Sequence, residues 1–215
     1  MAAPGVGGRI ASLLLATSNQ GKLRELRQLL DGCGWRLLSP ADVGMGPADF
    51  PSEGEDSYLD NAILKAQTGA RFSGLVCLGE DSGLEVDALD GAPGPASAVF
   101  LGPQATYEER FRYILGRLEG LPDSRRTARF RCLMAVADPV SGRTWTVEGV
   151  CEGLIARGPR GTGGFGYDPI FYLPTLMSTM AELPEHQKNI VSHRARAAWQ
   201  VRQVLKELLH EHARR

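Results

Sequence analysis

A short apolar run near the start of the chain constrains the fold more than any other feature of the sequence. Residues 12–16 form this run, and a polar turn at residues 17–21 follows it directly. Between residues 22 and 30, leucines recur at the spacing of one helix face, and Gly32 and Gly34 end the pattern. A buried strand that leads through a polar turn into an amphipathic helix is typical of α/β proteins.

The rest of the chain continues this alternation of strand-like and helix-like segments. Further helices are expected to begin at Ser57, Thr106 and His193, and the first two have acids three residues on that fit an approximate capping box. The expected strands are residues 75–78, 84–89, 128–137 and 144–151. A hairpin at residues 138–142 is expected to join the last two strands, so the pattern again predicts an α/β fold.

The charge balance limits the partners that we expect. The 215 residues include 24 basic and 25 acidic side chains, for a formal net charge of −1. Proteins that bind nucleic acid polymers or anionic membranes usually carry a strong basic excess. The longest apolar run falls well short of the ~20 residues of a membrane span and does not fit a secretory signal. We expect a cytoplasmic protein with a flexible extension at residues 1–9 and one domain at residues 10–212.

The turn at residues 17–22 is the first candidate binding site. It precedes a helix, whose first N–H groups and positive dipole end favour an anion. Thr17 and Asn19 add side-chain donors, and Lys22 adds a positive charge. The pattern G-x-x-x-x-G-K-[ST] of phosphate-binding loops is absent. An ordinary strand–turn–helix connection would use the same residue types, so both interpretations remain open.

The acids Glu80 and Asp81 follow the second predicted strand. Ligands of open α/β sheets bind beyond the carboxyl ends of strands, and carboxylate oxygens suit Mg²⁺. Neighbouring strand residues point to opposite faces, so the two acids need not bind the same ion. A solvated turn is the alternative. The acidic stretch at residues 50–55 offers another ligand, but its spacing does not identify which acid.

The glycine-rich segment at residues 161–166 matches G-x-G-x-x-G, the pattern of dinucleotide-binding turns. We reject that interpretation because no strand leads into the segment, and Asp168 and Pro169 stand where a helix should begin. We expect instead that the loop places Phe165 against a flat ring, with Asp168 accepting hydrogen bonds from that ring. A purely structural loop is the alternative.

Basic residues near the end of the chain are the last candidates. Lys188, His193 and Arg194 are able to donate hydrogen bonds to the carbonyl oxygens of a base. Judged from these residues alone, an ordinary basic helix face is the favoured explanation. The four arginines within residues 125–131 are interpreted mostly as a solvated or interface face, because alternate strand residues point outward.

In this order, these segments resemble the inosine triphosphate pyrophosphatase family, whose enzymes hydrolyse non-standard purine nucleoside triphosphates such as ITP, dITP and XTP. The matching segments are LLLATSNQGKLREL, DNAILKA, EDSGLEVDAL, GTGGFGYDPIF, AEL and SHRARA, which span Leu13 to about Leu205. The resemblance implies a mixed twisted sheet with flanking helices and two lobes around a central nucleotide-binding cleft. It also implies Mg²⁺-dependent hydrolysis to the monophosphate and pyrophosphate, which cleanses the nucleotide pool, by a homodimer.

The resemblance further implies a role for each candidate residue. Asp81 would be the catalytic proton acceptor and a Mg²⁺ ligand, and Glu53 would be the second metal ligand. The triphosphate would contact Thr17, Ser18, Asn19, Gln20, Gly21, Lys22, Lys65 and Ser82. The purine would contact Phe165, Gly166, Tyr167, Asp168, Lys188, His193 and Arg194. A nucleotide-binding or RNA-binding module that uses the same cleft without hydrolysis is the rival hypothesis.

Overall fold

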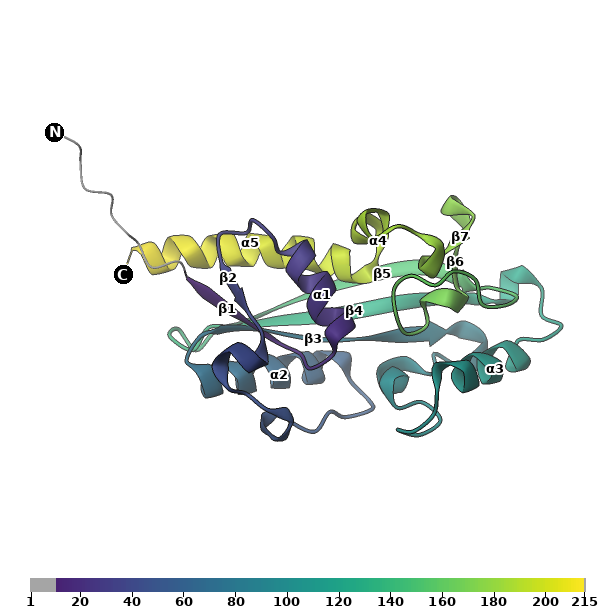
Figure 1. Ribbon diagram of the computed structural model, residues 1–215, viewed down its shortest axis with the longest axis horizontal. Helices are drawn as coiled ribbons and strands as arrows, with labels where there is room; N and C mark the ends of the chain where they lie inside the picture. Colours follow the sequence, from purple (N-terminus) through teal and green to yellow (C-terminus); the bar gives the residue numbers. More distant parts are fainter. Residues whose placement is uncertain (1–10, 215) are drawn as a thin grey trace.

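The computed structural model in Figure 1 describes residues 11–214. Within that range the strands form one mixed, seven-stranded sheet in the order β2-β1-β3-β4-β5-β6-β7. The strands are β1 (Ser12–Ala16), β2 (Arg36–Leu38), β3 (Val76–Val86), β4 (Thr127–Ala137), β5 (Thr144–Ile155), β6 (Phe171–Leu173) and β7 (Ser178–Thr179). Strand β1 is parallel to β2 and β3, and the remaining pairs are antiparallel. The predicted α/β class with a mixed sheet is confirmed. The division into two lobes stays a prediction. The extension expected at residues 1–9 lies outside the described residues.

Helices cover both faces of this sheet. They are α1 (Gln20–Leu29), α2 (Tyr58–Ser73), α3 (Tyr107–Arg117), α4 (Glu185–Val191) and α5 (His193–Ala213). In Figure 1, α5 and α1 lie along one face and α2 and α3 along the other. Among residues 11–214, no helix combines the length and apolar character that crossing a bilayer requires.

The pleat of β1 divides its side chains between the two faces. Leu13 and Leu15 pack with α1 and α5, while Leu14 and Ala16 pack with α2. This alternation with period two is the geometry of a strand buried on both faces. It also explains why the run reads as continuously apolar in the sequence.

Side-chain caps begin α2 and α3 where the sequence predicts, whereas α1 begins at Gln20, two residues before the predicted start at Lys22. The Asn19 side chain accepts a hydrogen bond from the backbone N–H of Lys22 at the start of α1. Thr106 and Glu109 form the expected reciprocal box at α3, and the Ser57 side chain caps α2 by accepting from the N–H of Asp60. Such caps satisfy N–H groups that have no partner within the helix.

The middle strand differs from the prediction. Strand β3 is continuous from Val76 to Val86 and pairs with β4 along its whole length, so residues 80–83 are not a turn between two strands. Strand β1 stops beside Gly79, where Ala16 is its last paired residue. The polar residues of β3 therefore lie beside the carboxyl end of β1. The strand end that we expected to carry the ligand site is the end of β1, because β3 continues past this point.

One arginine of the basic stretch also contradicts its interpretation as solvated. Arg126 is buried and donates to the backbone carbonyl oxygens of Leu118, Ile155 and Ala156. A buried guanidinium needs such acceptors, because an unpaired charge in the core is costly. Arg129 follows the expectation, since its side chain is partly exposed and pairs with the exposed carboxylates of Asp87 and Glu152.

Candidate active site

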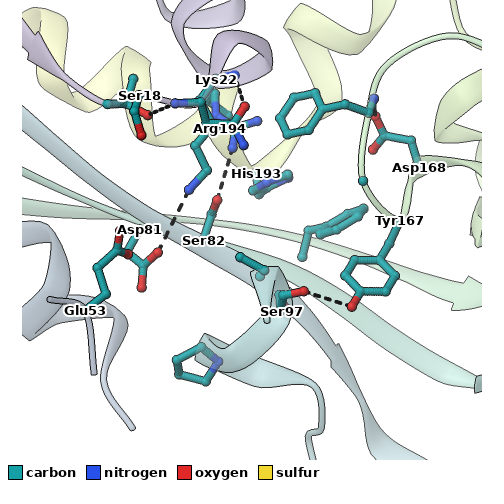
Figure 2. A pocket seen from close by; sticks show the side chains of 18 of the residues that line it. Ser18, Lys22, Glu53, Asp81, Ser82, Ser97, Tyr167, Asp168, His193 and Arg194 are labelled. Carbon is teal, nitrogen blue, oxygen red and sulfur yellow. Dashed lines mark hydrogen bonds and ion pairs between the residues drawn. The ribbon is translucent and has the colours of Figure 1, made fainter. Parts of the chain in front are cut away.

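A cleft with a volume of about 260 Å³ opens where β1 ends. Its walls come from the β1–α1 turn, the loop before α2, the middle of β3, the glycine-rich loop and the α4–α5 junction (Figure 2). Every predicted site residue lines the cleft except Gln20 and Gly21. Gly21 lies under the Phe165 ring, so close that an added Cβ would be 2.7 Å from a ring carbon. Segments that are far apart in the sequence thus converge on one cavity.

The β1–α1 turn forms one end of the cleft. Thr17 Oγ1 accepts a hydrogen bond from the N–H of Asn19 at 3.2 Å, and Asn19 Oδ1 accepts one from the N–H of Lys22 at 3.1 Å. These bonds stabilise the turn, and the side-chain oxygen Oδ1 of Asn19 is used to cap α1. The start of a helix beside Lys22 is suited to a phosphate group.

Asp81 lies at the centre of the cleft and is 4% exposed. Asn61 Nδ2 donates to its Oδ2 at 2.9 Å, while Lys65 Nζ and Lys22 Nζ lie 3.5 Å and 3.9 Å from its Oδ1. Burial raises the pKa of Asp81 above its ordinary value, although both lysines and Asn61 oppose the shift. A carboxylate in this state accepts a proton more readily than one in water.

The donors beside Asp81 fit a hard divalent cation. Glu53 and Asp81 provide carboxylate oxygens, and both contact the same ammonium group of Lys65. Mg²⁺ commonly takes only one or two protein carboxylates and completes its shell with phosphate oxygens and water. In the described part of the chain, no group of three or more His, Cys, Asp or Glu side chains is arranged to hold a metal. The residues therefore suit an ion whose other ligands come from a bound phosphate.

Glu80 points to the opposite face of β3, under α5. Arg194 Nε lies 3.1 Å and 3.0 Å from its two oxygens, and Arg194 Nη2 also donates to Ser82 Oγ at 3.1 Å. Burial alone would raise the pKa of Glu80, but Arg194 and then Lys22 outweigh it and hold the pKa below its ordinary range. Glu80 thus anchors Arg194, and it lies on the other side of β3 from the carboxylates of Asp81 and Glu53.

Lys188 and Asp168 form the other end of the cleft. Lys188 Nζ donates to Asp168 Oδ2 and lies 2.7 Å from Glu25 Oε1. Asp168 also accepts from the N–H of Phe165 at 2.8 Å, so its carboxylate holds the glycine-rich loop in place. Burial raises the pKa of Asp168, although Lys188 opposes the shift. The Phe165 ring lies 4.9 Å from Lys188 Nζ and 5.3 Å from Arg194 Cζ, which places an aromatic face over two cations.

His193 forms part of the cleft wall near these cations. Its ring stacks on Phe130 with the centroids 4.7 Å apart, and its buried Nδ1 has no hydrogen-bond partner among the described residues. Burial, reinforced by the charge of Arg194, lowers the pKa of His193 well below its ordinary value, so the ring is neutral. Gly149 permits this placement, since an added Cβ there would lie 2.1 Å from the His193 carbonyl oxygen.

Asn61 and Glu25 are buried polar residues of the site that are absent from the predicted set. Asn61 accepts from the N–H of Gly54 and donates to its carbonyl oxygen, both at 2.8 Å, and it also contacts Asp81. Glu25 lies on α1 and pairs with both Lys188 and Arg194. Asn61 lies one helical turn before Lys65, and Glu25 lies three residues after Lys22. In the sequence, the signal that could have identified them was their spacing of three or four residues from Lys22 and Lys65, which places each pair on one face of a helix.

Known proteins resemble this chain over nearly its whole length. A model of the Ham1 family matches residues 13–204. The dITP/XTP pyrophosphatase of Desulforamulus reducens is 48% identical over 198 residues, which are 91% of this chain and 96% of that protein. The dITP/XTP pyrophosphatase of Geobacter sulfurreducens is 48% identical over 187 residues, with coverage of 86% and 92%. A solved HAM1 protein from Coxiella burnetii has a TM-score of 0.79 at 39% identity and covers 92% of this chain and 99% of its own.

Proposed function

This chain belongs to the Ham1 family, and from that premise we propose that it is a Mg²⁺-dependent pyrophosphatase of non-standard purine nucleoside triphosphates. The chain is a hydrolase that acts on acid anhydrides, a diphosphatase like its named relatives. The family resemblance stated from the sequence is thereby confirmed. The proposed substrates are ITP, dITP and XTP, and the proposed products are the monophosphate and pyrophosphate, so that the reaction would cleanse the nucleotide pool.

The observation that carries this proposal is the division of one cleft into two chemically different ends. One end combines a helix start, two lysines and the carboxylate of Asp81, as a metal-bound triphosphate requires. The other end combines the Phe165 ring with Lys188 and the neutral His193, as a flat base with carbonyl oxygens requires. A nucleoside triphosphate is a ligand that has both parts.

In the proposed reaction, Asp81 accepts a proton from the water that attacks the α-phosphorus. The bond from that phosphorus to the α,β-bridging oxygen breaks, and pyrophosphate leaves with the bonding electrons. Lys22 and Lys65, which already lie within 4 Å of Asp81, stabilise the charge that develops on the leaving group. A Mg²⁺ ion held by Asp81 and Glu53 would supply charge neutralisation and polarisation of the phosphates.

The base end supports a preference for purines with an oxygen at position six. Lys188 Nζ has three N–H donors, and its two contacts with Glu25 and Asp168 leave one for such an oxygen. Adenine presents an amino donor at the same position. Two opposed donors would leave buried groups unpaired, which costs about 1–3 kcal/mol for each group.

A pyrophosphate-release assay tests the proposal directly. The protein is incubated with ITP, dITP, XTP and the four standard triphosphates, with Mg²⁺ and with a chelator. We expect pyrophosphate and monophosphate from the three non-standard nucleotides, and no turnover without the metal. Release of orthophosphate would identify a different reaction. Tight nucleotide binding without any turnover would favour the rival hypothesis of a binding module.

The cellular setting and assembly are further parts of the proposal. Both ends of the described chain contribute to the cleft, from Thr17 to Arg194, which supports residues 10–212 as one domain. We propose a cytoplasmic homodimer that has neither nucleic acid polymers nor membranes as partners. Light scattering coupled to size-exclusion chromatography checks the assembly, because a dimer would have twice the chain mass of 23.2 kDa.

A further inference from the structure

Lys65 occupies the space between the two carboxylates that we assign to the metal. Its Nζ lies 2.7 Å from Glu53 Oε2 and 3.5 Å from Asp81 Oδ1. The side chains of Lys65 and Asp81 are each 6% exposed, whereas that of Glu53 is 49% exposed. In the protein without substrate, an ammonium group therefore already balances part of the negative charge of this acidic pair.

A second lysine completes this balance. Lys22 Nζ lies 3.9 Å from Asp81 Oδ1 and 3.6 Å from Glu80 Oε1, and its side chain is 14% exposed. A divalent cation that approached Asp81 alone would meet two ammonium groups at contact distance, in a place where burial weakens screening by solvent. Displacing either lysine without giving it a new partner would leave a buried charge unpaired, which is strongly unfavourable.

We propose that Lys65 is a resident counter-ion that excludes free divalent cations and moves to the phosphates when the nucleotide binds. The cation then enters together with the nucleotide, and the complex of the two is what the cleft recognises. This inference rests on the proposed function, because it takes Glu53 and Asp81 as the metal ligands and the triphosphate as the new partner of Lys65. The exchange keeps every charge paired, since the phosphates supply the negative charge that Lys65 gives up.

The backbone next to Glu53 and the carboxylate of Asp81 are both held by contacts that do not involve Lys65. Asn61 binds both backbone groups of Gly54, next to Glu53, and donates to the carboxylate of Asp81. Removing the lysine should therefore leave Glu53 and Asp81 close together but unbalanced in charge. A variant of Lys65 is therefore an informative test, because a cation could bind to Glu53 and Asp81 once the ammonium group is removed.

The test measures Mn²⁺ binding, with the free ion followed by electron paramagnetic resonance and no turnover required. Without nucleotide, the wild-type protein is expected to show no saturable binding below millimolar Mn²⁺. Lys65→Met should bind Mn²⁺ at least about tenfold more tightly, a change of the size seen when groups around a metal site are altered. Lys65→Arg keeps the charge and should behave as wild type. Lys206→Met removes one of the four lysines at an exposed position of α5, and it should also behave as wild type.

A second arm uses only the wild-type protein, so it does not depend on the folding of a variant. In α,β-methylene inosine triphosphate a CH2 group replaces the α,β-bridging oxygen, so it is not hydrolysed there. After correction for the Mn²⁺ that the free analogue binds, its addition should tighten Mn²⁺ binding to the protein by at least about tenfold through coupling of the two ligands. Wild-type protein that binds Mn²⁺ equally well with and without the nucleotide analogue would overturn the inference, and so would a folded Lys65→Met protein that gains no affinity. Either result alongside normal pyrophosphate release from ITP refutes the counter-ion role alone. Absence of turnover for all triphosphates refutes the proposed function instead.

Discussion

Arg194 at the start of α5 and Glu80 in the middle of β3 form a buried ion pair that joins residues 114 apart in the sequence. Arg194 Nη2 lies 2.7 Å from Glu80 Oε1, and neither residue is more than 2% exposed. Arg194 Nη1 continues the contact to Glu25 on α1 at 2.6 Å. One guanidinium therefore fastens two helices to the sheet directly beneath the cleft.

Removing the charge of Glu80 should destabilise the fold strongly. Glu80→Gln leaves Arg194 with a single buried carboxylate partner, Glu25, and breaking a buried pair in this way costs about 3–5 kcal/mol. Glu85→Gln is a matched control in the same strand, whose arginine partners are partly exposed and have other carboxylates. It should cost about 1 kcal/mol or less. Urea unfolding compares the two, and equal losses would show that the buried pair has no special role.

Local sequence patterns predicted those helices and strands in which apolar side chains repeat with one constant spacing along the whole element. The leucines of residues 22–30 face one side of α1, and the apolar stripe of α5 through Val201 and Leu205 is buried as expected. Periodicity and capping act within a few residues, so they can be recognised without knowledge of the fold. The hairpin between β4 and β5 was predictable for the same reason.

Features that depend on distant partners were not predictable in this way. Strand β3 runs through Glu80, Asp81 and Ser82 because Arg194 and the cleft lysines satisfy polar residues that would otherwise interrupt a buried strand. The family resemblance placed Asp81 and the lysines in the cleft, but it did not reveal the contacts of Asn61 or Glu25. Those contacts form only after α1, α2 and α5 have packed on the sheet.

Loss of the Asn61 side chain should impair activity more than stability. Asn61→Ala frees the loop that carries Glu53 and removes the hydrogen bond to Asp81. Because residues that orient metal ligands typically contribute 10–100-fold, we expect kcat/KM for ITP to fall by about that factor. Steady-state kinetics at several Mg²⁺ concentrations measures this effect. A fall in thermal stability with unchanged kcat/KM would show that Asn61 is only structural.

The contribution of His193 to stability should decrease as the pH falls below about 6.5. The pKa of His193 in the folded protein is well below its ordinary value of 6.5, so the unfolded chain binds more protons in this range. The free energy of unfolding therefore falls with decreasing pH, by at most about 1.4 kcal/mol per pH unit for this one group. Glu80 and Glu25 also have lowered pKa values and add a further loss below about pH 4.5, whereas Asp81 and Asp168, whose pKa values are raised, act in the opposite direction.

The contribution of His193 can be isolated with variants. His193→Phe preserves an aromatic ring against Phe130 and should flatten the pH dependence of unfolding between pH 5 and 6.5, a range set by its ordinary pKa. His210→Gln changes an exposed histidine on α5 and should leave the slope as in wild type. Urea midpoints across the pH range provide the comparison. Identical slopes in all three proteins would exclude His193 as the source.

Asp81→Asn should abolish most turnover while the fold remains. The amide cannot accept the proton from water, and loss of a general base typically lowers the rate by about 10²–10⁴-fold. Asn61 and both lysines remain to contact the new side chain. Pyrophosphate release from ITP and circular dichroism measure the two properties separately. A folded variant that turns over ITP near the wild-type rate would show that another group accepts the proton.

Lys188→Ala should reduce discrimination between ITP and ATP. The ratio of kcat/KM for the two nucleotides is expected to fall by about tenfold or more, which corresponds to one lost hydrogen bond of about 1–3 kcal/mol. The variant also leaves Asp168 without its ammonium partner, so its unfolding must be measured at the same time. Lys22→Ala is the matched control at the phosphate end, where it should lower kcat/KM for both nucleotides by similar factors. An unchanged ITP-to-ATP ratio in a folded Lys188→Ala protein would assign base selection to other residues of the cleft.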